Sequence, residues 1–504
     1  MLSGEFNRSS SRIWFAVLAV VGLLAFWPSA ASAAPGHAAA APVFNVKSYG
    51  ATGNGTTNDT PAINKAITAA NKAGGGIVEF PSGTFLAGGS IHLLSNVTIQ
   101  LDKGSTIAGA SSGYDKAESN PNDKYQDYGH SHFHDAMIWG DSLTNIGFTG
   151  SGTIDGKGKF ATGTPKSGQA DKLISLTRCD GLTLDGITLR NGGHFAILTN
   201  GCNNITSDHL TISTASDRDG WNVISAQHVK ITNINDSSND DALVFKSDWA
   251  LGKTLPNGDV SVDNATLSAS CCNALMFGSE TCGDFTGYTF TNINITKAGK
   301  SGLGIVSMDG ANVSNVTYDH VTMSGTASPI MEKIGERKRC GGSPGVGSIS
   351  DIHYEDVTGT NAGSYSPTLW GQNGHDISNI TFDNVHLTLP GGHAAMSTGV
   401  PSDNGDYNPN SIGTRPAYGF YLHYVTGVGF TSSSFAFSKN DARPAIIANS
   451  SGPVTLNHVT AQSGSGSPFD IGFQSTKGYC VQNSTTSSGG TLKINSSSGS
   501  SSGC

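Results

Sequence analysis

Apolar and polar residues alternate along short segments of this chain from about residue 95 onward, and the same phrase returns many times. Each copy is a short alternating run with Asn, Asp or Gly at its edges, which is typical of a half-buried strand between turns. The copies are SNVTIQLD, TNIGFTGSGTID, DGLTLDGITLRN, NNITSDHLTIS, QHVKITNIND, GDVSVDNATLS, SNVTYDHVTMSG, SDIHYEDVTGT, SNITFDNVHLTL and GPVTLNHVTAQ. Equivalent positions Leu182, Ile205 and Val229 lie 23 and 24 residues apart. A period in the twenties predicts an all-β solenoid, whose turns lack a core until neighbouring turns stack on them.

Two other features of the pattern bear on the fold. A sandwich or a propeller also has alternating strands, but a propeller needs about 40 residues per blade. Residues 52–75 have helical spacing after Asp59-Thr60-Pro61 and end in glycines, so we expect a helix that caps the N-terminal end of the solenoid. We assign residues 34–482 to a single solenoid domain that carries the active site. Residues 483–504 are predicted to be a loosely held tail rich in Ser and Gly.

The N-terminal 33 residues have the features of a secretory signal. Arg8 and Arg12 precede the apolar segment 13–27, and a small-residue site ends at Ala33. The apolar segment is too short for a stable membrane span, and no later run is long enough to be one. We therefore predict a secreted, extracellular protein.

Composition and charge narrow the classes of function. Charged residues make up 13% of the chain, and it contains 66 glycines, which suits many short strands joined by turns. The formal net charge of −9 argues against nucleic acids and anionic membrane surfaces as partners.

Eight cysteines in an exported chain favour disulfides over metal sites. Residues one period apart lie above one another in a solenoid, so two pairs are predicted to staple adjacent turns: Cys179–Cys202 and Cys480–Cys504. The other four could form two more bridges whose pairing the sequence leaves open: Cys271, Cys272, Cys282 and Cys340. Zinc is disfavoured because the ligand spacing is wrong.

Asp240 and Asp241 stand together just before the apolar run ALVF. Neighbouring like charges at the mouth of a buried strand are unfavourable unless something uses them. Asp219 precedes Asp240 by 21 residues, close to one period, so it should lie in the turn beneath the pair. Adjacent side chains of a regular strand point to opposite faces. Both aspartates can face one cleft only if the chain bends or bulges here, which Asn239 favours.

Three clustered carboxyl groups suit the hydrolysis of glycosides. One carboxyl with a raised pKa protonates the leaving oxygen while another activates water. Inversion requires about 6.5–9.5 Å between the acid and the base, which side chains from neighbouring turns can span. A calcium site or a solvated turn is the alternative interpretation, since Asp and Asn are common at the corners of solenoids.

Six segments, taken in order, resemble a known family. They are VKSYGATGNGTTNDTPAINKAI, FPSGTFLAGGSIHLLSNVTIQLDKGSTI, GSGTIDGKG, DRDGWNV, NDDALVFKS and ALMFGSET. From about residue 44 to residue 325 the chain resembles glycoside hydrolase family 28, the polygalacturonase and rhamnogalacturonase family.

The resemblance implies a right-handed, single-stranded parallel β-helix that hydrolyses pectic polysaccharides with inversion and without a cofactor or metal. Asp219 matches the aspartate of the family's Asn-Thr-Asp motif, and Asp240 and Asp241 match its Asp-Asp pair. By this resemblance Asp240 is the general acid, and Asp219 and Asp241 hold the attacking water. We expect a monomer whose partner is a polysaccharide.

The chain departs from the family pattern at three places. The Gly-His-Gly motif falls on residues 272–274, with Asn273 where polygalacturonases have histidine. The Arg-Ile-Lys motif, which grips the galacturonate carboxylate, falls on the Gly-Ile-Val sequence at 304–306, so both cations are missing. Asp217-Arg218 replaces Asn-Thr. A site without paired donors binds a carboxylate poorly, so we predict action beside rhamnose or another neutral sugar rather than simple polygalacturonase activity.

Further substrate contacts are predicted more weakly, each beside a structural alternative. Glu280 either borders the cleft or is a corner residue, and His194 either lines the cleft or is packed in the interior. Trp221 offers a face for stacking on a sugar, or fills the core. Arg337 and Arg339 replace the lost cationic grip, or belong to a solvated basic loop. The full predicted substrate-binding set is Asn273, Glu280, His194, Trp221, Arg337 and Arg339.

One motif and two other classes of function stay open. His130, His132 and His134 would share one face of an extended segment, to bind substrate or a metal, or to pack a loop. A polysaccharide lyase would need calcium and a strong base at the cleft. A non-catalytic carbohydrate-binding β-helix is favoured by the lost Arg-Ile-Lys pattern.

Overall fold

The computed structural model describes residues 41–497 and 503–504, except residues 215, 362 and 364. The predicted signal at residues 1–33 lies outside the described residues. Among the helices that the structure describes, none has the length and apolarity needed to cross a bilayer. Residues 41–504 form one compact unit.

The helical elements are short and few in the described chain. They are η1 (Val46–Tyr49), α1 (Thr60–Lys72), η2 (Asp123–Tyr125), α2 (Tyr128–Ser131) and η3 (Pro409–Ser411). The strands of the N-terminal part are β1 (Val43–Asn45), β2 (Asn54–Asn58), β3 (Gly76–Phe80), β4 (Gly83–Ala87), β5 (Ile91–His92), β6 (Val97–Leu101), β7 (Ser105–Gly109), β8 (Ala136–Asp141), β9 (Thr144–Gly150), β10 (Thr153–Asp155), β11 (Lys172–Thr177), β12 (Asp180–Asp185), β13 (Thr188–Arg190), β14 (Phe195–Asn200), β15 (Asn203–Asp208) and β16 (Thr211–Thr214).

The central strands are longer. They are β17 (Asp219–Ile224), β18 (Gln227–Ser238), β19 (Leu243–Ser247), β20 (Gly258–Ala269), β21 (Leu275–Thr281), β22 (Phe285–Ser307), β23 (Asn312–Ile334), β24 (Ser348–Asn361), β25 (Thr368–Trp370) and β26 (Ile377–Gly391). The C-terminal strands are β27 (Phe420–His423), β28 (Val425–Thr431), β29 (Ser434–Lys439), β30 (Ile446–Asn449), β31 (Val454–Asn457), β32 (Thr460–Ala461), β33 (Ile471–Gln474), β34 (Tyr479–Gln482), β35 (Thr485–Thr486) and β36 (Ile494–Ser496).

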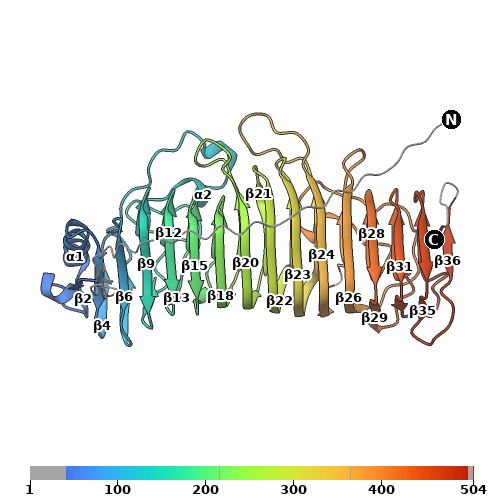
Figure 1. The fold of residues 1–504 in the computed structure, drawn as a ribbon, viewed down its shortest axis with the longest axis horizontal. Helices are drawn as coiled ribbons and strands as arrows, with labels where there is room; N and C mark the ends of the chain where they lie inside the picture. Colours follow the sequence, from blue (N-terminus) through green and yellow to red (C-terminus); the bar gives the residue numbers. More distant parts are fainter. Residues whose placement is uncertain (1–40, 215, 362, 364, 498–502) are drawn as a thin grey trace, which may run out of the picture. The chain divides into compact units, whose positions relative to one another are not determined.

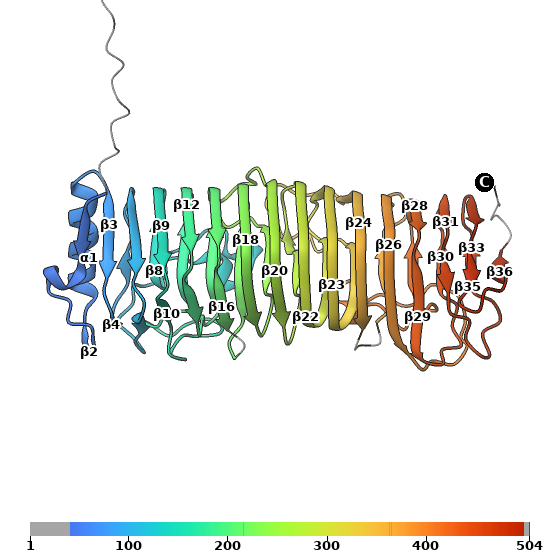
Figure 2. The same ribbon diagram turned by 60° about the horizontal axis from the view of Figure 1, so that its bottom comes forward.

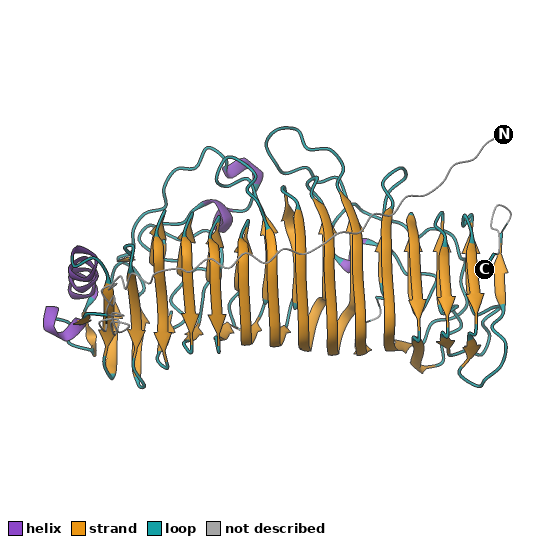
Figure 3. Cartoon of the chain, in the orientation of Figure 1, coloured by secondary structure: helices purple, strands orange, loops and turns teal. Residues whose placement is uncertain are grey.

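The strands stack in parallel, one turn of the chain upon the next, so that the unit is a parallel β-helix (Figures 1 and 3). Leu182 pairs with Ile205 and Ile205 with Val229 across β12, β15 and β18. These are the positions whose spacing defines the sequence period. The predicted solenoid is therefore confirmed, and one sequence repeat is one turn.

The asparagines at the edges of the repeat form the corners of the turns. Asn204, Asn233, Asn264 and Asn292 all have φ between 54° and 57°, in the left-handed region that Asn tolerates better than most residues. The side-chain amide of Asn233 donates to Asp208 Oδ1 of the turn below at 2.7 Å, and Asn264 donates to Asn233 Oδ1 at 2.6 Å. The repeated Asn and Asp therefore both bend the chain and link successive turns.

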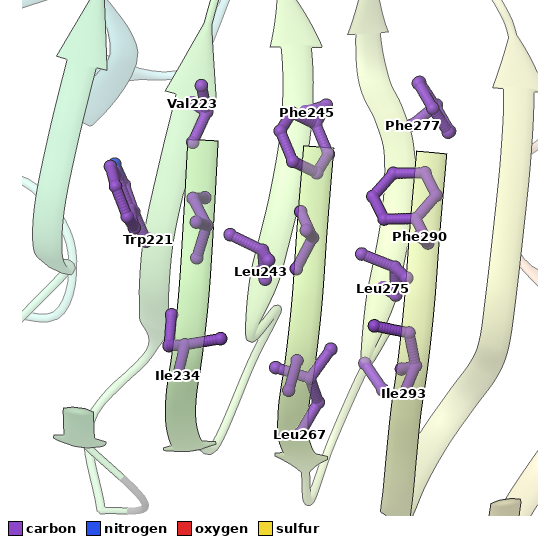
Figure 4. Close-up of a cluster of buried hydrophobic side chains, with 14 of the residues drawn as sticks. Trp221, Val223, Ile234, Leu243, Phe245, Leu267, Leu275, Phe277, Phe290 and Ile293 are labelled. Carbon is purple, nitrogen blue, oxygen red and sulfur yellow. The ribbon is translucent and has the colours of Figure 1, made fainter. Parts of the chain in front are cut away.

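The interior is filled by side chains from alternate strand positions. Aromatic rings repeat one turn apart and stack with centroids 4.7–5.1 Å apart in the order Phe290, Tyr318, Tyr354, Phe382 and Phe430. Figure 4 shows the inward-pointing side chains at the centre of the molecule, which include Trp221, Val223, Leu243, Phe245, Leu275 and Phe277. Stacking makes this core continuous along the whole helix.

Helix α1 begins where the Asp59-Thr60-Pro61 signal predicts. Asp59 accepts hydrogen bonds from the backbone of Thr52 and Gly53 at 2.7 and 3.1 Å, which fixes the chain entering the helix. The apolar stripe of α1 is buried: Ala62, Ile63, Ala66, Ile67 and Ala70. The helix lies at the N-terminal, blue end of the unit, packed against β1, β3 and β5 (Figure 2).

Both predicted disulfides are present, Cys179–Cys202 and Cys480–Cys504. Of the two further bridges that the other cysteines could form, the structure contains one, between Cys282 and Cys340. Cys271 and Cys272 remain thiols.

Strand pairing extends past the predicted domain boundary at residue 482. β35 pairs with β32 and β36 pairs with β33, so the solenoid continues past the boundary. Strands of two or three residues between Ser- and Gly-rich turns carry too weak an alternation to be seen in the sequence.

Candidate active site

Asp219 opens β17, and Asp240 and Asp241 lie in the bend that joins β18 to β19. The backbone N–H of Gly220 donates to the carbonyl of Asp241 at 2.8 Å, and that of Asp240 to the carbonyl of Arg218 at 3.1 Å. The two segments therefore belong to adjacent turns, as the 21-residue spacing predicts. The bend required for both aspartates to face one site is also present.

Lys246 is the buried cation around which the acidic groups gather. Its Nζ lies 3.9 Å from Asp219 Oδ2, 3.9 Å from Asp241 Oδ2 and 3.2 Å from Glu280 Oε2. The side chain is 4% exposed. Burial alone would lower the pKa of Lys246, but the surrounding carboxylates outweigh it and raise that pKa above its usual range. Lys246 is therefore a fixed positive charge at the centre of the cluster.

The sequence reasoning missed Lys246. A lysine within the apolar strand LVFKS was the available signal, because an unpaired charge in a buried strand is costly and implies an acidic partner. Val244 shares its strand face and packs with Met276, Val306 and Met308 in a cluster outside the main core. The face of β19 that carries Lys246 therefore points away from the interior.

Glu280, one of the carboxylates beside Lys246, is itself surrounded by further cationic side chains. Glu280 is buried, receives a hydrogen bond from Arg339 Nη2 at 3.1 Å and lies 3.8 Å from both Arg337 Nη1 and His130 Nε2. Burial opposes ionisation of Glu280, yet Lys246 and the other cations hold its pKa well below the usual range.

Buried amides orient two of the three aspartates. Asn273 donates to Asp241 Oδ1 from its side chain at 2.8 Å and from its backbone at 3.2 Å. Asn222 donates to Asp219 Oδ2 at 3.0 Å. Within the described residues the buried Oδ1 of Asp219 has no hydrogen-bond partner. That oxygen is available to a water or a ligand.

Asp240 is the most exposed of the three carboxyl groups, at 20% against 11% for Asp241 and 4% for Asp219. Arg218 donates to Asp240 Oδ2 from Nε at 3.1 Å and from Nη2 at 3.0 Å. One carboxyl oxygen each from Asp240 and Asp241 and the Cys272 sulfur lie within 4.8 Å of one another.

The surroundings shift the pKa values of the three carboxyl groups in opposite directions. Burial raises the pKa of Asp219 well above its usual range, and burial also raises that of Asp241 despite the charge of Lys246. These two groups hold a proton more readily than an exposed aspartate does.

The pKa of Asp240 moves the other way. Burial acts to raise it, but the hydrogen bond from Cys272 and the positive charges of Arg218 and Lys300 outweigh burial and lower it. The free protein therefore holds Asp240 as a carboxylate.

Three of the predicted substrate contacts are buried side chains. Trp221 is fully buried and points into the core (Figure 4), where its Nε1 donates to Thr199 Oγ1 at 3.2 Å. His194 is 4% exposed and stacks on Phe195. Glu280 is enclosed by cations. Trp221 fills the core, which is the structural alternative given for it, and His194 and Glu280 are buried among protein groups in the free protein.

The remaining predicted contacts take different positions. Asn273 is 1% exposed and acts on Asp241. Arg337 forms two hydrogen bonds to Asp309 and lines a hollow of about 430 Å³ with Lys333. Arg339 is 31% exposed and reaches Glu280. Only the two arginines keep a surface that a sugar could touch.

The three histidines do not share one face. The prediction of an extended segment is wrong because α2 coils through residues 128–131. His130 is buried with Nε2 3.1 Å from Lys246 Nζ, and burial lowers its pKa to about 4. His132 stacks on Tyr128, while His134 stacks on the ring of a tryptophan in β8.

Fold and site together define a right-handed parallel β-helix with an acidic cluster built around a buried lysine, outside its main core. The model of the Glycosyl hydrolases family 28 matches residues 79–405, well over half of the chain. The chain belongs to this family, and the resemblance found in the sequence is confirmed.

Relatives and solved structures agree with this placement. The chain is similar to an endo-polygalacturonase of Pectobacterium carotovorum subsp. carotovorum, at 27% identity over 65% of this chain and 84% of that protein. It is 26% identical to endo-xylogalacturonan hydrolase A of Aspergillus tubingensis, over 77% of this chain and 96% of that protein. The fold resembles the family 28 exopolygalacturonase of Yersinia enterocolitica, with a TM-score of 0.62 and 18% identity over 84% of this chain and 79% of that chain.

Proposed function

We propose that the protein is a secreted, monomeric glycoside hydrolase that cleaves a pectic polysaccharide with inversion. The observation that carries this proposal is the set of three aspartates that two adjacent turns bring to one site. Two carboxyl groups at one glycosidic bond can act as acid and base in one reaction. The pKa of Asp240 is lowered in the free protein, so Asp240 must take up a proton before it can act as the acid. The names of the related proteins, a polygalacturonase and a xylogalacturonan hydrolase, support a pectic substrate.

We assign the general acid role to Asp240, which has the greatest exposure and so the best access to a glycosidic oxygen. The buried Asp219 and Asp241 would hold the attacking water, with the unpartnered Oδ1 of Asp219 as one acceptor for it. The charge of Lys246 opposes the effect of burial on the pKa of this pair, and so favours the ionised form that the base requires. Asn273 fixes the direction of Asp241.

The substrate is proposed to be a rhamnogalacturonan-type or galacturonan-type chain. The Gly-Ile-Val sequence at 304–306 lies in β22, and Gly304 pairs with Met276 of β21, so no cation stands where the family's Arg-Ile-Lys motif falls. Secretion is supported by the disulfides, which persist in oxidising surroundings.

The test is a screen of homogalacturonan, rhamnogalacturonan and xylogalacturonan for release of reducing ends. Asp240→Asn and Asp219→Asn should each lower kcat by about 10²–10⁴-fold. Asp259→Asn is the matched control, because Asp259 is 76% exposed and pairs only with His228 among the described contacts. Wild-type rates in the Asp240 variant would refute the assignment of the acid.

A further inference from the structure

We propose that Arg218 is a specificity-determining residue that changes partner during turnover. It holds Asp240 in the free protein and moves to a carboxylate of the substrate, which releases Asp240 to act as general acid. The inference rests on the proposed function and places an unesterified uronic acid beside the bond that is cut, in place of the neutral sugar that the missing Arg-Ile-Lys cations predict there.

The Arg218–Asp240 contact is incomplete as an ion pair. Nε and Nη2 both point at a single oxygen, Asp240 Oδ2. The planar guanidinium fork binds best when two oxygens of one carboxylate each take one N–H. A uronate that offers both oxygens is therefore a better partner than Asp240, and it can compete for the fork.

Arg218 is also more exposed than two cations that hold the buried carboxylates. Its side chain is 38% exposed, against 4% for Lys246 and 19% for Arg337. Lys246 is engaged by three carboxylates, and Arg337 by Asp309 through two hydrogen bonds. Nη1 of Arg218 reaches the carbonyl of Thr162 at 3.5 Å. This contact is long enough to leave the guanidinium free to shift.

The charged groups around Asp240 determine whether Asp240 is protonated, so moving Arg218 away changes its protonation state. Five groups on neighbouring elements face Asp240. They are Arg218 just before β17, Asp219 at the start of β17, Asp241 in the same bend, Cys272 before β21, and Lys300 in β22. The two cations and the thiol favour the ionised form, while the two aspartates favour the protonated form. Removing Arg218 from this set tips Asp240 toward taking up a proton from solvent.

Protons are balanced over one catalytic cycle. Asp240 gains one proton from solvent when Arg218 leaves and gives it to the leaving glycosidic oxygen. Water adds to the anomeric carbon and passes its proton to Asp219 or Asp241, which returns it to solvent. A neutral sugar cannot replace Asp240 as the partner of Arg218, so its complex keeps the acid ionised. The fork would thus discriminate between uronates and neutral sugars even though the family's Arg-Ile-Lys cations are missing.

The experiment compares unesterified oligogalacturonides with their methyl esters, which lack the negative charge and carry one added methyl group on each esterified carboxyl. Wild type should have a higher kcat/KM on the free acid than on the methyl ester. In Arg218→Gln the ratio of these two kcat/KM values should fall by about tenfold or more. Arg218→Lys keeps the charge without the fork and should retain part of the preference. The matched control is Arg178→Gln, because Arg178 forms an exposed pair with Asp141 at 2.7 Å and lies outside the cluster.

A pH profile provides a readout that a merely structural role would not move. In wild type the alkaline limb of kcat/KM, which reports the free enzyme, should lie at lower pH than the alkaline limb of kcat, which reports the complex. In Arg218→Gln the two limbs should coincide. An unchanged preference for the free acid together with an unchanged separation of the limbs would overturn the proposal.

The outcomes separate this inference from the proposed function. If Asp240→Asn is inactive while Arg218→Gln keeps the wild-type preference and pH profile, only the exchange is refuted. If wild type cuts another pectic fraction but neither oligogalacturonide form, the uronate class is refuted and the hydrolase stands. Full activity of Asp240→Asn on either form refutes both.

Discussion

Replacing Lys246 with methionine tests the role of the buried cation. Methionine keeps most of the length of the side chain and removes the charge that Asp219, Asp241 and Glu280 share. Breaking a buried ion pair by deleting one partner costs about 3–5 kcal/mol, because the remaining charges are left in a poorly solvated site. The variant relieves this cost when one carboxyl group takes up a proton.

The size and the pH dependence of the loss follow from linkage. An aspartate in the unfolded chain has an ordinary pKa of 3.8. Keeping it protonated in the folded variant costs about 1.4 kcal/mol for each pH unit above that value, or about 4 kcal/mol at pH 7. The native variant then binds more protons than the unfolded chain does, so its stability falls as pH rises. The difference between variant and wild type should be small near pH 4 and should grow up to pH 7.

The assay is reversible urea unfolding, followed by tryptophan fluorescence at several pH values. Lys338→Met is the control, because its partner Glu336 is exposed and the pair spans 2.7 Å at the surface. That variant should leave the unfolding midpoint unchanged. The double variant Lys246→Met with Glu280→Gln should be more stable than Lys246→Met alone, because it also removes one of the carboxylates that the lysine neutralised. A loss below about 1 kcal/mol, or one that does not change with pH, would show that Lys246 does not neutralise the buried carboxylates.

Three further predictions concern the scaffold. Replacing Cys179 and Cys202 together with alanine should lower the free energy of unfolding by about 3 kcal/mol, because the bridge closes a loop of 23 residues; an unchanged urea midpoint would contradict this. Tyr354→Phe removes the hydrogen bond of 2.8 Å to Glu332, whose pKa burial raises to about 8, and should cost about 1–3 kcal/mol in the same assay. Trp221→Ala should lower the free energy of unfolding by about 3–5 kcal/mol but leave KM unchanged for the folded enzyme. A raised KM would indicate that Trp221 contacts the substrate.

The sequence was sufficient for the fold because the solenoid repeats its own signals. Leu182, Ile205 and Val229 occupy equivalent positions of successive turns. Residues one sequence period apart are therefore neighbours in the structure. The same logic located Asp219 beneath Asp240 and Asp241 and paired the terminal cysteines. In each of these cases sequence separation alone determines the neighbour.

Side-chain direction could not be predicted in this way. Trp221 and Lys246 lie in strands β17 and β19 of adjacent turns, yet one points into the core and the other into the acidic cluster. The alternation itself is regular, because Trp221 pairs with Leu243 on the inward face and Lys246 pairs with Ile224 on the opposite face. Both faces of β17 and β19 are buried, so the sequence does not show which face points into the core. The partners of Arg218 and Glu280 are likewise set by charges from several turns, which become neighbours only after the chain has coiled.

Digestion of pectic fractions in water enriched in ¹⁸O, with the product masses recorded, tests directly whether the aspartate cluster hydrolyses the glycosidic bond. Hydrolysis by the aspartate cluster would place one ¹⁸O at the anomeric carbon of each new reducing end in wild type, and Asp240→Asn would yield almost no product. Unlabelled products carrying a double bond, as a lyase makes, or binding without any cleavage, would contradict the account.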